Sequence, residues 1–247
     1  QLNGDSEWFI DTGSTVSLDG NLAGDNNYNQ LDKLGDGTLV LAGAGQTTAG
    51  IELYAGTLVV SGEYLFENDA LRVRDAGGTV ILASDSNTPL HSNSSKAWRL
   101  WDSFTMQTSD ATARQMDSNV TLELDATITL DGPGDMSFGG DWDLGGRNLT
   151  MDIASDRTVT LSGAMTGTRS LTQSGDGNLV LAGTGGTNYG VLPEGGTLVL
   201  AGEYADAGVG GRALQFKSGP VEVVLASDSN QAFGGDGVAQ FQDLGEG

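Results

Sequence analysis

The fold is decided by residues 31–64, LDKLGDGTLVLAGAGQTTAGIELYAGTLVVSGEY, which recur as residues 171–204, LTQSGDGNLVLAGTGGTNYGVLPEGGTLVLAGEY. The two stretches align without a gap at an offset of 140 (171 − 31). Self-similarity of this length is typical of repeat proteins, in which each unit buries its apolar face against the next unit. We therefore expect a stack of similar units.

The duplication extends in both directions beyond these stretches. Two shorter matches continue it at an offset of 143 (158 − 15 and 225 − 82), namely TVSLDG at 15–20 with TVTLSG at 158–163, and LASDSN at 82–87 with the same letters at 225–230. The change in offset is three residues, which a loop tolerates. We predict a single solenoid domain over 1–247, with an internal duplication of 1–104 and 144–247 and an unduplicated insert at 105–143.

Short strands recur within each copy, and many of them lie roughly twenty residues apart, a spacing typical of solenoids. In residues 38–41, 57–60 and 79–82, which read TLVL, TLVV and TVIL, alternate side chains are apolar. This alternation turns one set of side chains inward and the other outward. Helical periodicity is nearly absent, and 39 glycines among 247 residues indicate many tight turns. The sequence predicts an all-β fold of stacked parallel coils, a β-solenoid.

One pattern of glycine, leucine and threonine runs through residues 31–62: Leu31, Lys33, Gly35, Gly37, Thr38, Leu39, Leu41, Gly43, Thr47, Gly50, Gly56, Leu58, Val60 and Gly62. Residues 171–202 repeat it, with Gln173, Asn178 and Leu200 as mild departures. The pattern resembles the passenger-associated transport repeat of bacterial autotransporters.

This resemblance implies a right-handed parallel β-helix, exported to the extracellular side or the outer cell surface of a Gram-negative bacterium. It implies no catalytic residue, because the repeats of that family are scaffold. In that family a membrane β-barrel follows the passenger, and the sequence up to Gly247 shows none of its strand pattern. We therefore expect a cleaved passenger, a passenger fragment, or a secreted relative that uses another route.

The charge balance is strongly acidic, with 33 Asp and Glu against 11 Lys and Arg and a net charge of −22. Such a surface repels nucleic acids and anionic lipids, so we expect no nucleic-acid partner and no direct membrane insertion. Many aspartates lie beside glycine in expected turns: Asp25, Asp36, Asp135, Asp176 and Asp236. Turn chemistry is the simpler interpretation. Calcium is the one cofactor we consider possible, although no calcium β-roll or EF-hand pattern is present.

Three features suggest catalysis, and each has a simpler interpretation. Asp11-Thr12-Gly13-Ser14 is similar to the catalytic loop of aspartic proteases, but that chemistry needs a second aspartate and the repeat register makes this segment a turn. His91 is the only histidine and has no identifiable partner. Asp141-Trp142-Asp143 would place two carboxylates on one side of a strand, as in a glycosidase or a polysaccharide lyase.

We nevertheless predict that the chain is not an enzyme. Close acid pairs are expected by chance in so acidic a chain, and a lyase acting on uronates needs basic residues, which are few here. Glu63 and Glu203 are equivalent in the two copies, which favours a structural role. The absence of cysteine excludes disulfides and thiolate chemistry. A polysaccharide-degrading β-helix enzyme, a lyase or a glycosidase, is the alternative.

The aromatic segment 98–104, WRLWDSF, closes the first copy. We predict an interaction patch formed by Trp98, Trp101 and Phe104, and the structural alternative is that they cap or plug one coil. The function expected from all these features is that of a non-catalytic extracellular structural protein, an adhesin or a self-assembling filament or biofilm-matrix subunit. Solenoid ends expose strand edges, so head-to-tail self-association is expected, and carbohydrate of a host surface or matrix is a further possible partner.

Overall fold

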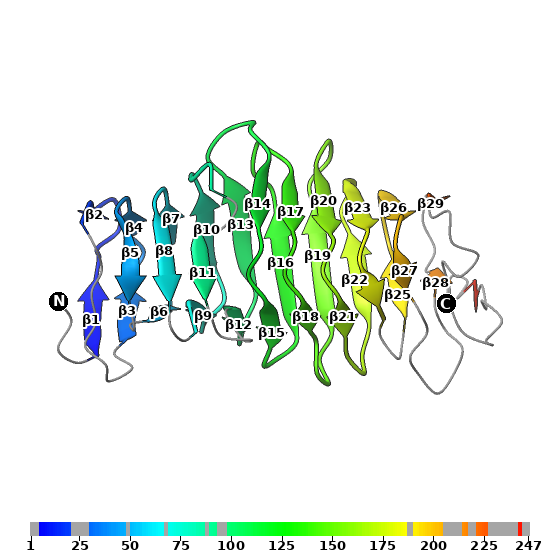
Figure 1. Ribbon diagram of the computed structural model, residues 1–247, viewed down its shortest axis with the longest axis horizontal. Helices are drawn as coiled ribbons and strands as arrows, with labels where there is room; N and C mark the ends of the chain where they lie inside the picture. The colour runs from blue at the N-terminus through cyan, green and yellow to red at the C-terminus, as the bar shows by residue number, and fades with distance from the viewer. Residues whose placement is uncertain are drawn as a thin grey trace.

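Parallel strand pairing runs through the whole computed structural model, which describes residues 5–20, 30–47, 50–66, 69–86, 89–92, 98–186, 190–204, 214–216, 221–226 and 242–243. The elements of these residues are all strands, and they follow one another along an elongated stack from β1 to β29 (Figure 1). Successive strands of the described turns lie on three faces in order, and strands of neighbouring turns pair along each face, except at one break on the third face. The prediction of an all-β parallel solenoid is confirmed. Its right-handedness stays a prediction.

Face 1 is a ten-stranded sheet. Its strands are β1 (Ser6–Phe9), β3 (Gln30–Leu34), β6 (Gly50–Leu53), β9 (Leu71–Val73), β12 (Trp98–Leu100), β15 (Val120–Leu122), β18 (Trp142–Asp143), β21 (Met165–Thr166), β24 (Thr184–Gly185) and β27 (Glu203–Tyr204). Face 2 is a nine-stranded sheet. Its strands are β2 (Thr15–Leu18), β4 (Thr38–Leu41), β7 (Thr57–Val60), β10 (Gly78–Leu82), β13 (Phe104–Thr108), β16 (Ala126–Leu130), β19 (Leu149–Ile153), β22 (Leu171–Ser174) and β25 (Val191–Pro193).

Face 3 is divided into two sheets. The first contains β5 (Ala44–Thr47), β8 (Glu63–Phe66) and β11 (Leu90–Ser92), and the second contains β14 (Arg114–Met116), β17 (Met136–Phe138), β20 (Thr158–Leu161), β23 (Asn178–Leu181), β26 (Thr197–Leu200) and β29 (Glu222–Leu225). A separate two-stranded sheet joins β28 (Gln215–Phe216) to β30 (Gln242–Asp243).

The core is a column of apolar side chains inside the coil. Leu31, Ile51 and Leu71 are in register on β3, β6 and β9, and all three are fully buried. The strands β4, β7 and β10 show the alternation that the sequence predicts for them, with every second residue buried. Stacking therefore gives each turn the apolar contacts and the backbone partners that it lacks alone.

Glycine is required where the corners of successive turns stack. A Cβ at Gly62 would overlap the carbonyl oxygen of Gly43, and a Cβ at Gly202 would overlap that of Gly183. The backbones approach so closely there that no side chain fits. The recurring Ala-Gly and Ser-Gly pairs at the strand ends thus mark corners of the coil.

The gap in face 3 is closed by side chains. Because β11 and β14 are not paired, the carbonyl oxygen of Leu90 has no strand partner on that side. The hydroxyl of Ser118 donates to this oxygen at 2.6 Å, and the indole N–H of Trp98 donates to it at 3.4 Å. A buried carbonyl that would otherwise be left unpaired is thereby satisfied.

The two copies of the repeat lie on different faces of the coil. Residues 31–34 form β3 on face 1, whereas the equivalent residues 171–174 form β22 on face 2. The difference is 19 strands (22 − 3), which is six turns of three strands and one strand more. Each strand of the second copy therefore lies on the face that follows the face of its equivalent in the first copy. The same sequence forms glycine corners in both positions. The limits of the copies and of the insert 105–143 stay predictions.

Candidate binding surface on face 1

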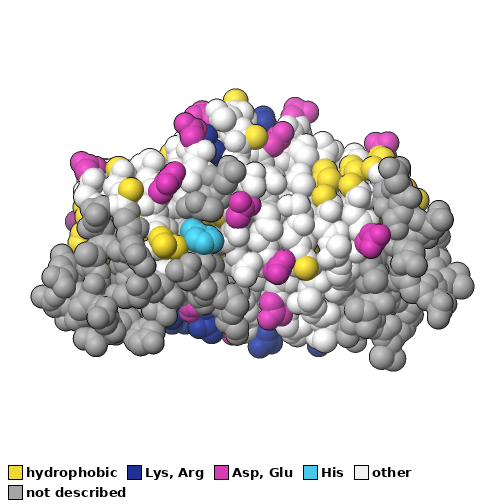
Figure 2. All heavy atoms as spheres, in the orientation of Figure 1, with side chains coloured by type: hydrophobic (Ala, Val, Ile, Leu, Met, Phe, Trp, Pro, Cys, Tyr) yellow, Lys and Arg dark blue, Asp and Glu magenta, His cyan; other side chains and the backbone are white. Residues whose placement is uncertain are grey.

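Two rows of outward side chains run along face 1. The charged row follows the strand register through Glu7, Asp32, Glu52, Arg72, Arg99, Thr121 and Asp143. The aromatic row lies two residues further along each strand and contains Phe9, Leu34, Tyr54, Arg74, Trp101 and Glu123. Each member of a row lies beside its neighbours in the turns before and after it. In Figure 2 basic side chains gather along the lower edge of the molecule, where Figure 1 shows most strands of face 1.

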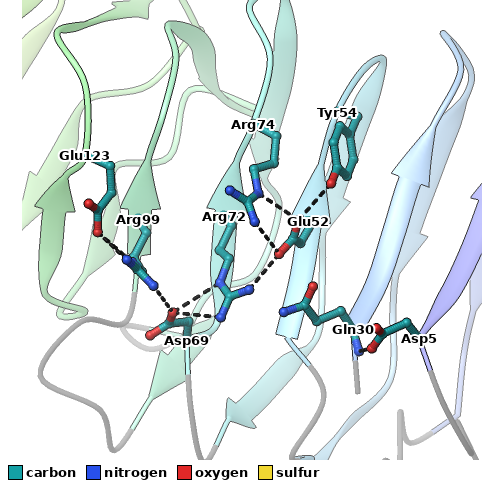
Figure 3. Close-up of polar contacts among 9 residues, drawn as sticks. All are labelled: Asp5, Gln30, Glu52, Tyr54, Asp69, Arg72, Arg74, Arg99 and Glu123. Carbon is teal, nitrogen blue, oxygen red and sulfur yellow. Dashed lines mark hydrogen bonds and ion pairs between the residues drawn. The ribbon is translucent and has the colours of Figure 1, made fainter. Parts of the chain in front are cut away.

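Glu52 is the centre of an ionic network (Figure 3). Its side chain is only 2% exposed, and it forms ion pairs with Arg72 at 2.6 Å and with Arg74 at 2.7 Å. The phenol of Tyr54 donates to it at 3.0 Å. Burial by itself raises the pKa of Glu52, but the hydrogen bonds from Arg74, Arg72 and Tyr54 outweigh it and hold the pKa below its ordinary value. Glu52 is therefore charged and fully engaged at neutral pH.

Asp69 continues the network to the next turns (Figure 3). It pairs with Arg72 at 3.0 Å and with Arg99 at 3.1 Å, and Arg99 also pairs with Glu123. Burial lowers the pKa of Arg99, but its bonds to Glu123 and Asp69 outweigh this and raise the pKa overall. The alternating acids and bases link four turns, from β6 to β15.

Trp101 holds the same region from the aromatic row. The guanidinium carbon of Arg74 lies 4.1 Å from the centre of its ring, and that of Arg99 lies 4.5 Å from it. Both distances are within the range of cation–π attraction. The indole therefore orients two of the three arginines of the network.

The charged row becomes purely acidic toward β1. Burial raises the pKa of Asp32, and the neighbouring carboxylates of Glu52, Asp5 and Glu7 raise it further, against a smaller opposing effect of Arg74. Among the described residues, its Oδ1 is buried without a hydrogen-bond partner. Asp32 and Glu52 are thus adjacent carboxylates whose pKa values are moved in opposite directions.

The predicted patch of Trp98, Trp101 and Phe104 is divided between core and surface. Trp98 is 1% exposed and Phe104 is 4% exposed, so both side chains pack inside the coil. Trp101 alone is partly exposed. A partner that docks here would contact Trp101 and its arginines rather than the three aromatic rings together.

The protease-like segment forms a corner between β1 and β2. The N–H of Ser14 donates to the carbonyl of Asp11 at 2.9 Å, and Gly13 has a φ of 78°. The equivalence with the second copy is visible in the next turn. A Cβ at Gly37 would overlap Ile10 and Asp11, and a Cβ at Gly177 would overlap Ile153 and Ala154. Position 11 therefore corresponds to Ala154, and the segment occupies the turn that the repeat register predicts.

Asp141 and Asp143 are both exposed on one side of β18, and Trp142 between them points into the core. Each carboxylate accepts a backbone N–H, Asp141 from Ala164 at 2.8 Å and Asp143 from Gly145 at 2.9 Å. His91 lies in β11, and its Nδ1 is buried without a partner among the described residues. Glu63 and Glu203 are exposed. The structure does not bring these groups together with the network of Glu52.

Several acidic side chains bind the backbone of the following turn. Asp125 accepts the N–H of Asn148 at 2.9 Å, and Asp135 accepts the N–H of Thr158 at 2.8 Å, in the same way as Asp141. The hydrogen bonds from Asn148 hold the pKa of Asp125 below its ordinary value. Of the turn aspartates named from the sequence, Asp25 and Asp236 lie outside the described residues. In the described ranges, no cluster of three acids or histidines is placed to hold a metal ion.

The network on face 1 was not anticipated from the sequence. Glu52, Arg72 and Arg99 are separated by 20 and 27 residues (72 − 52 and 99 − 72), so only the first interval has the regular spacing. The available signal was that residues 72–99 contain four of the 11 basic residues of an acidic chain.

Comparisons with models of protein families, with curated proteins and with solved structures found no significant match. The fold therefore defines the class, a parallel β-solenoid with an ionic network on one outer face. No described helix is long and apolar enough to cross a bilayer.

Proposed function

We propose that the chain is a non-catalytic extracellular structural protein of a bacterial surface, an adhesin or a subunit of a self-assembling filament or matrix. One observation carries this proposal. The ionisable groups best placed for chemistry, Glu52, Asp135 and Asp141 among them, bind side chains or backbone of neighbouring turns. Groups that hold a scaffold together are not available to a substrate.

The passenger-like repeats support an outer-surface location in a Gram-negative bacterium and export as a β-helix. Without cysteine the chain is stabilised by its core and its backbone ladders. Head-to-tail contact between two molecules of the protein would continue the parallel sheets, and such a contact can propagate because it does not close on itself. Cations such as calcium would reduce the repulsion between chains of net charge −22.

A polysaccharide-cleaving activity is the second candidate, because Asp32 and Glu52 are adjacent carboxylates with divergent pKa values. That divergence is what an acid and a nucleophile need. Glu52, however, is almost completely buried and its oxygens are bound by two arginines and a tyrosine. We therefore favour the structural role.

The test uses beads coated with the purified chain, with and without calcium, exposed to surfaces coated with neutral and acidic polysaccharides. We expect the beads to aggregate or to adhere, with no release of reducing ends or unsaturated products. Product release that disappears in Asp141→Asn or Asp32→Asn would establish an enzyme instead. Beads that neither aggregate nor adhere under any condition would contradict the structural role.

A further inference from the structure

The aromatic row on face 1 places an aromatic ring on every second turn. Phe9 is on the first turn, Tyr54 on the third and Trp101 on the fifth, with Leu34 and Arg74 between them. Phe9 is 72% exposed, and Tyr54 and Trp101 are partly exposed. These rings are therefore on the surface and do not belong to the core.

The spacing of the rings follows from the pairing of the strands. Neighbouring strands are about 4.8 Å apart, so rings on alternate turns repeat at about 9.6 Å along the axis. In an extended β-1,4-linked glycan, successive sugars are turned over, so the same sugar face recurs once per disaccharide. The length of one such disaccharide is close to the spacing of the rings. Three aromatic platforms would then meet three equivalent sugars of one chain.

The charged row beside the rings selects the kind of glycan. Ionised carboxylates accept hydrogen bonds from hydroxyl groups, which every sugar carries. The acids Asp5, Glu7, Asp32, Glu52, Asp69, Glu123 and Asp143 outnumber the three arginines Arg72, Arg74 and Arg99 on this face. An acidic glycan would be repelled by this excess and by the net charge of the whole chain.

We propose that the aromatic row binds an extended β-1,4-linked glycan without acidic groups, lying along the axis of the coil. The proposal rests on the proposed function, since it names the partner of an adhesive surface. The rings of Phe9 and Tyr54 stack on the apolar faces of alternate sugars, and Trp101, whose ring also stacks with Arg74 and Arg99, contacts the next equivalent sugar. Glu7, the exposed carboxylate of the charged row beside Phe9, accepts hydrogen bonds from hydroxyls on one side of the glycan.

The test is isothermal titration of the intact chain with four hexasaccharides: β-1,4-linked glucose, β-1,4-linked N-acetylglucosamine, its deacetylated form, and an acidic β-1,4-linked mannuronate. We expect binding of the non-acidic oligomers and none of the mannuronate. Tighter binding of the deacetylated form would show that the acidic side chains select the glycan by its charge. Equal binding of the three non-acidic hexasaccharides would show that ring stacking provides most of the affinity.

Single changes in the row test the contribution of each ring. Phe9→Ala and Trp101→Ala are each expected to weaken binding about tenfold. Phe9 is so exposed that its removal leaves the fold intact, which keeps the test decisive if Trp101→Ala does not fold. Leu225→Ala on face 3 is the matched control and should leave binding unchanged, because it also removes an exposed apolar side chain, 58% exposed, but one that lies outside the aromatic row.

The double variant Leu34→Tyr with Tyr54→Leu tests the spacing itself. It keeps the number of rings and moves one of them by a single turn, so we expect about tenfold weaker binding. Undiminished binding in this variant, undiminished binding in Phe9→Ala, or no binding by the unchanged chain would each overturn the proposal. Bead aggregation without any glycan binding would contradict the glycan site but not the structural role. Release of cleaved polysaccharide would contradict the structural role itself.

Discussion

The two copies of the repeat build the same corner with different chemistry. Lys33 in the first copy is fully buried, and its ammonium donates to the carbonyls of Leu34 at 3.1 Å, Gly35 at 2.6 Å and Ala55 at 3.0 Å. Gln173 in the second copy is also fully buried, and its amide donates to the carbonyls of Gly177 and Thr197, each at 3.1 Å. What the corner requires is an inward donor for its carbonyls, and a positive charge is optional.

Lys33 and Gln173 each carry an electrostatic cost, and the two costs differ in kind. Burial lowers the pKa of Lys33, and the charge of Asp36 opposes this only in part. The neutral amide of Gln173 avoids that penalty, but its Oε1 is buried without a partner among the described residues. The first copy therefore has a desolvated charge and the second has an unpaired carbonyl oxygen. Variants that exchange the two residues measure which of these costs more stability.

The largest expected effect is at the glycines that both copies share. Gly62→Ala and Gly202→Ala would each force a methyl group into the carbonyl of the preceding corner. We expect each to lower the free energy of unfolding by about 4 kcal/mol, or to prevent folding, as measured by urea denaturation. Gly146→Ala is the control, since the nearest atom to its Cβ is 3.7 Å away, and it should change stability little. Tolerance of Gly202→Ala alone would show that the two corners are not equivalent.

Replacing the buried donor of the first copy has the next largest effect. Lys33→Met keeps the volume but removes the side-chain donor of the Gly35 and Ala55 carbonyls, while the Leu34 carbonyl keeps the N–H of Ile10, so we expect a loss of about 3 kcal/mol. Lys33→Gln installs the second copy's side chain and should cost less than about 1 kcal/mol. The pKa of Lys33 is lowered on folding, so the unfolded chain binds its proton more tightly and the Lys33 contribution to stability increases as pH rises toward 10.5. This part of the pH dependence should disappear in Lys33→Gln, and equal stability of Lys33→Met and the unchanged chain would contradict the donor role.

The centre of the ionic network has no counterpart in the second copy, because the positions equivalent to Glu52 and Arg72 are Leu192 and Gln215. Glu52→Gln leaves Arg72 and Arg74 without their shared carboxylate, and we expect a loss of about 2 kcal/mol. The pKa of Glu52 is lowered on folding, so its contribution is present above pH 4.5 and is lost as the pH falls through its lower folded pKa. Thermal melting of both chains between pH 3 and pH 7 measures this. Leu192→Ala is the control for the second copy and should show no such loss toward acid.

The sequence alone accounts for the coil but not for the placement of its parts. Alternation in residues 38–41 and the glycine corners depend on neighbours in sequence, so they could be predicted. The position of the second copy on another face could not, because turns differ in length. Leu71 is 20 residues from its partner Ile51 (71 − 51), while Trp98 is 27 from Leu71 (98 − 71).

The same limit explains the candidate site. Trp98 and Trp101 are three residues apart and look equivalent in sequence, yet one fills the gap in face 3 and the other stacks on arginines. An odd separation along a strand puts these two side chains on opposite faces, so their division could have been predicted, whereas the hydrogen bond of Trp98 to Leu90 depends on the break between β11 and β14. The extension of the network to Arg99 depends on the same irregularity, since Arg72 and Arg99 become neighbours only across the irregular turn between β9 and β12, whereas Glu52 and Arg72 have the regular spacing.

The smallest expected effect is at Asp32, the acidic end of the charged row. Its pKa is raised on folding by burial and by the carboxylates of Glu52, Asp5 and Glu7, so the folded chain binds this proton more tightly than the unfolded chain. Ionised Asp32 therefore destabilises the fold at neutral pH, and the penalty disappears as the pH falls through the raised pKa toward 3.8. Asp32→Asn should stabilise the chain at pH 7 by less than about 1 kcal/mol and should have no stabilising effect at pH 3. A lower melting temperature of Asp32→Asn at pH 7 would mean that Asp32 has a charged partner in solution, and the acidic end of face 1 would then belong to the same ionic network as Glu52.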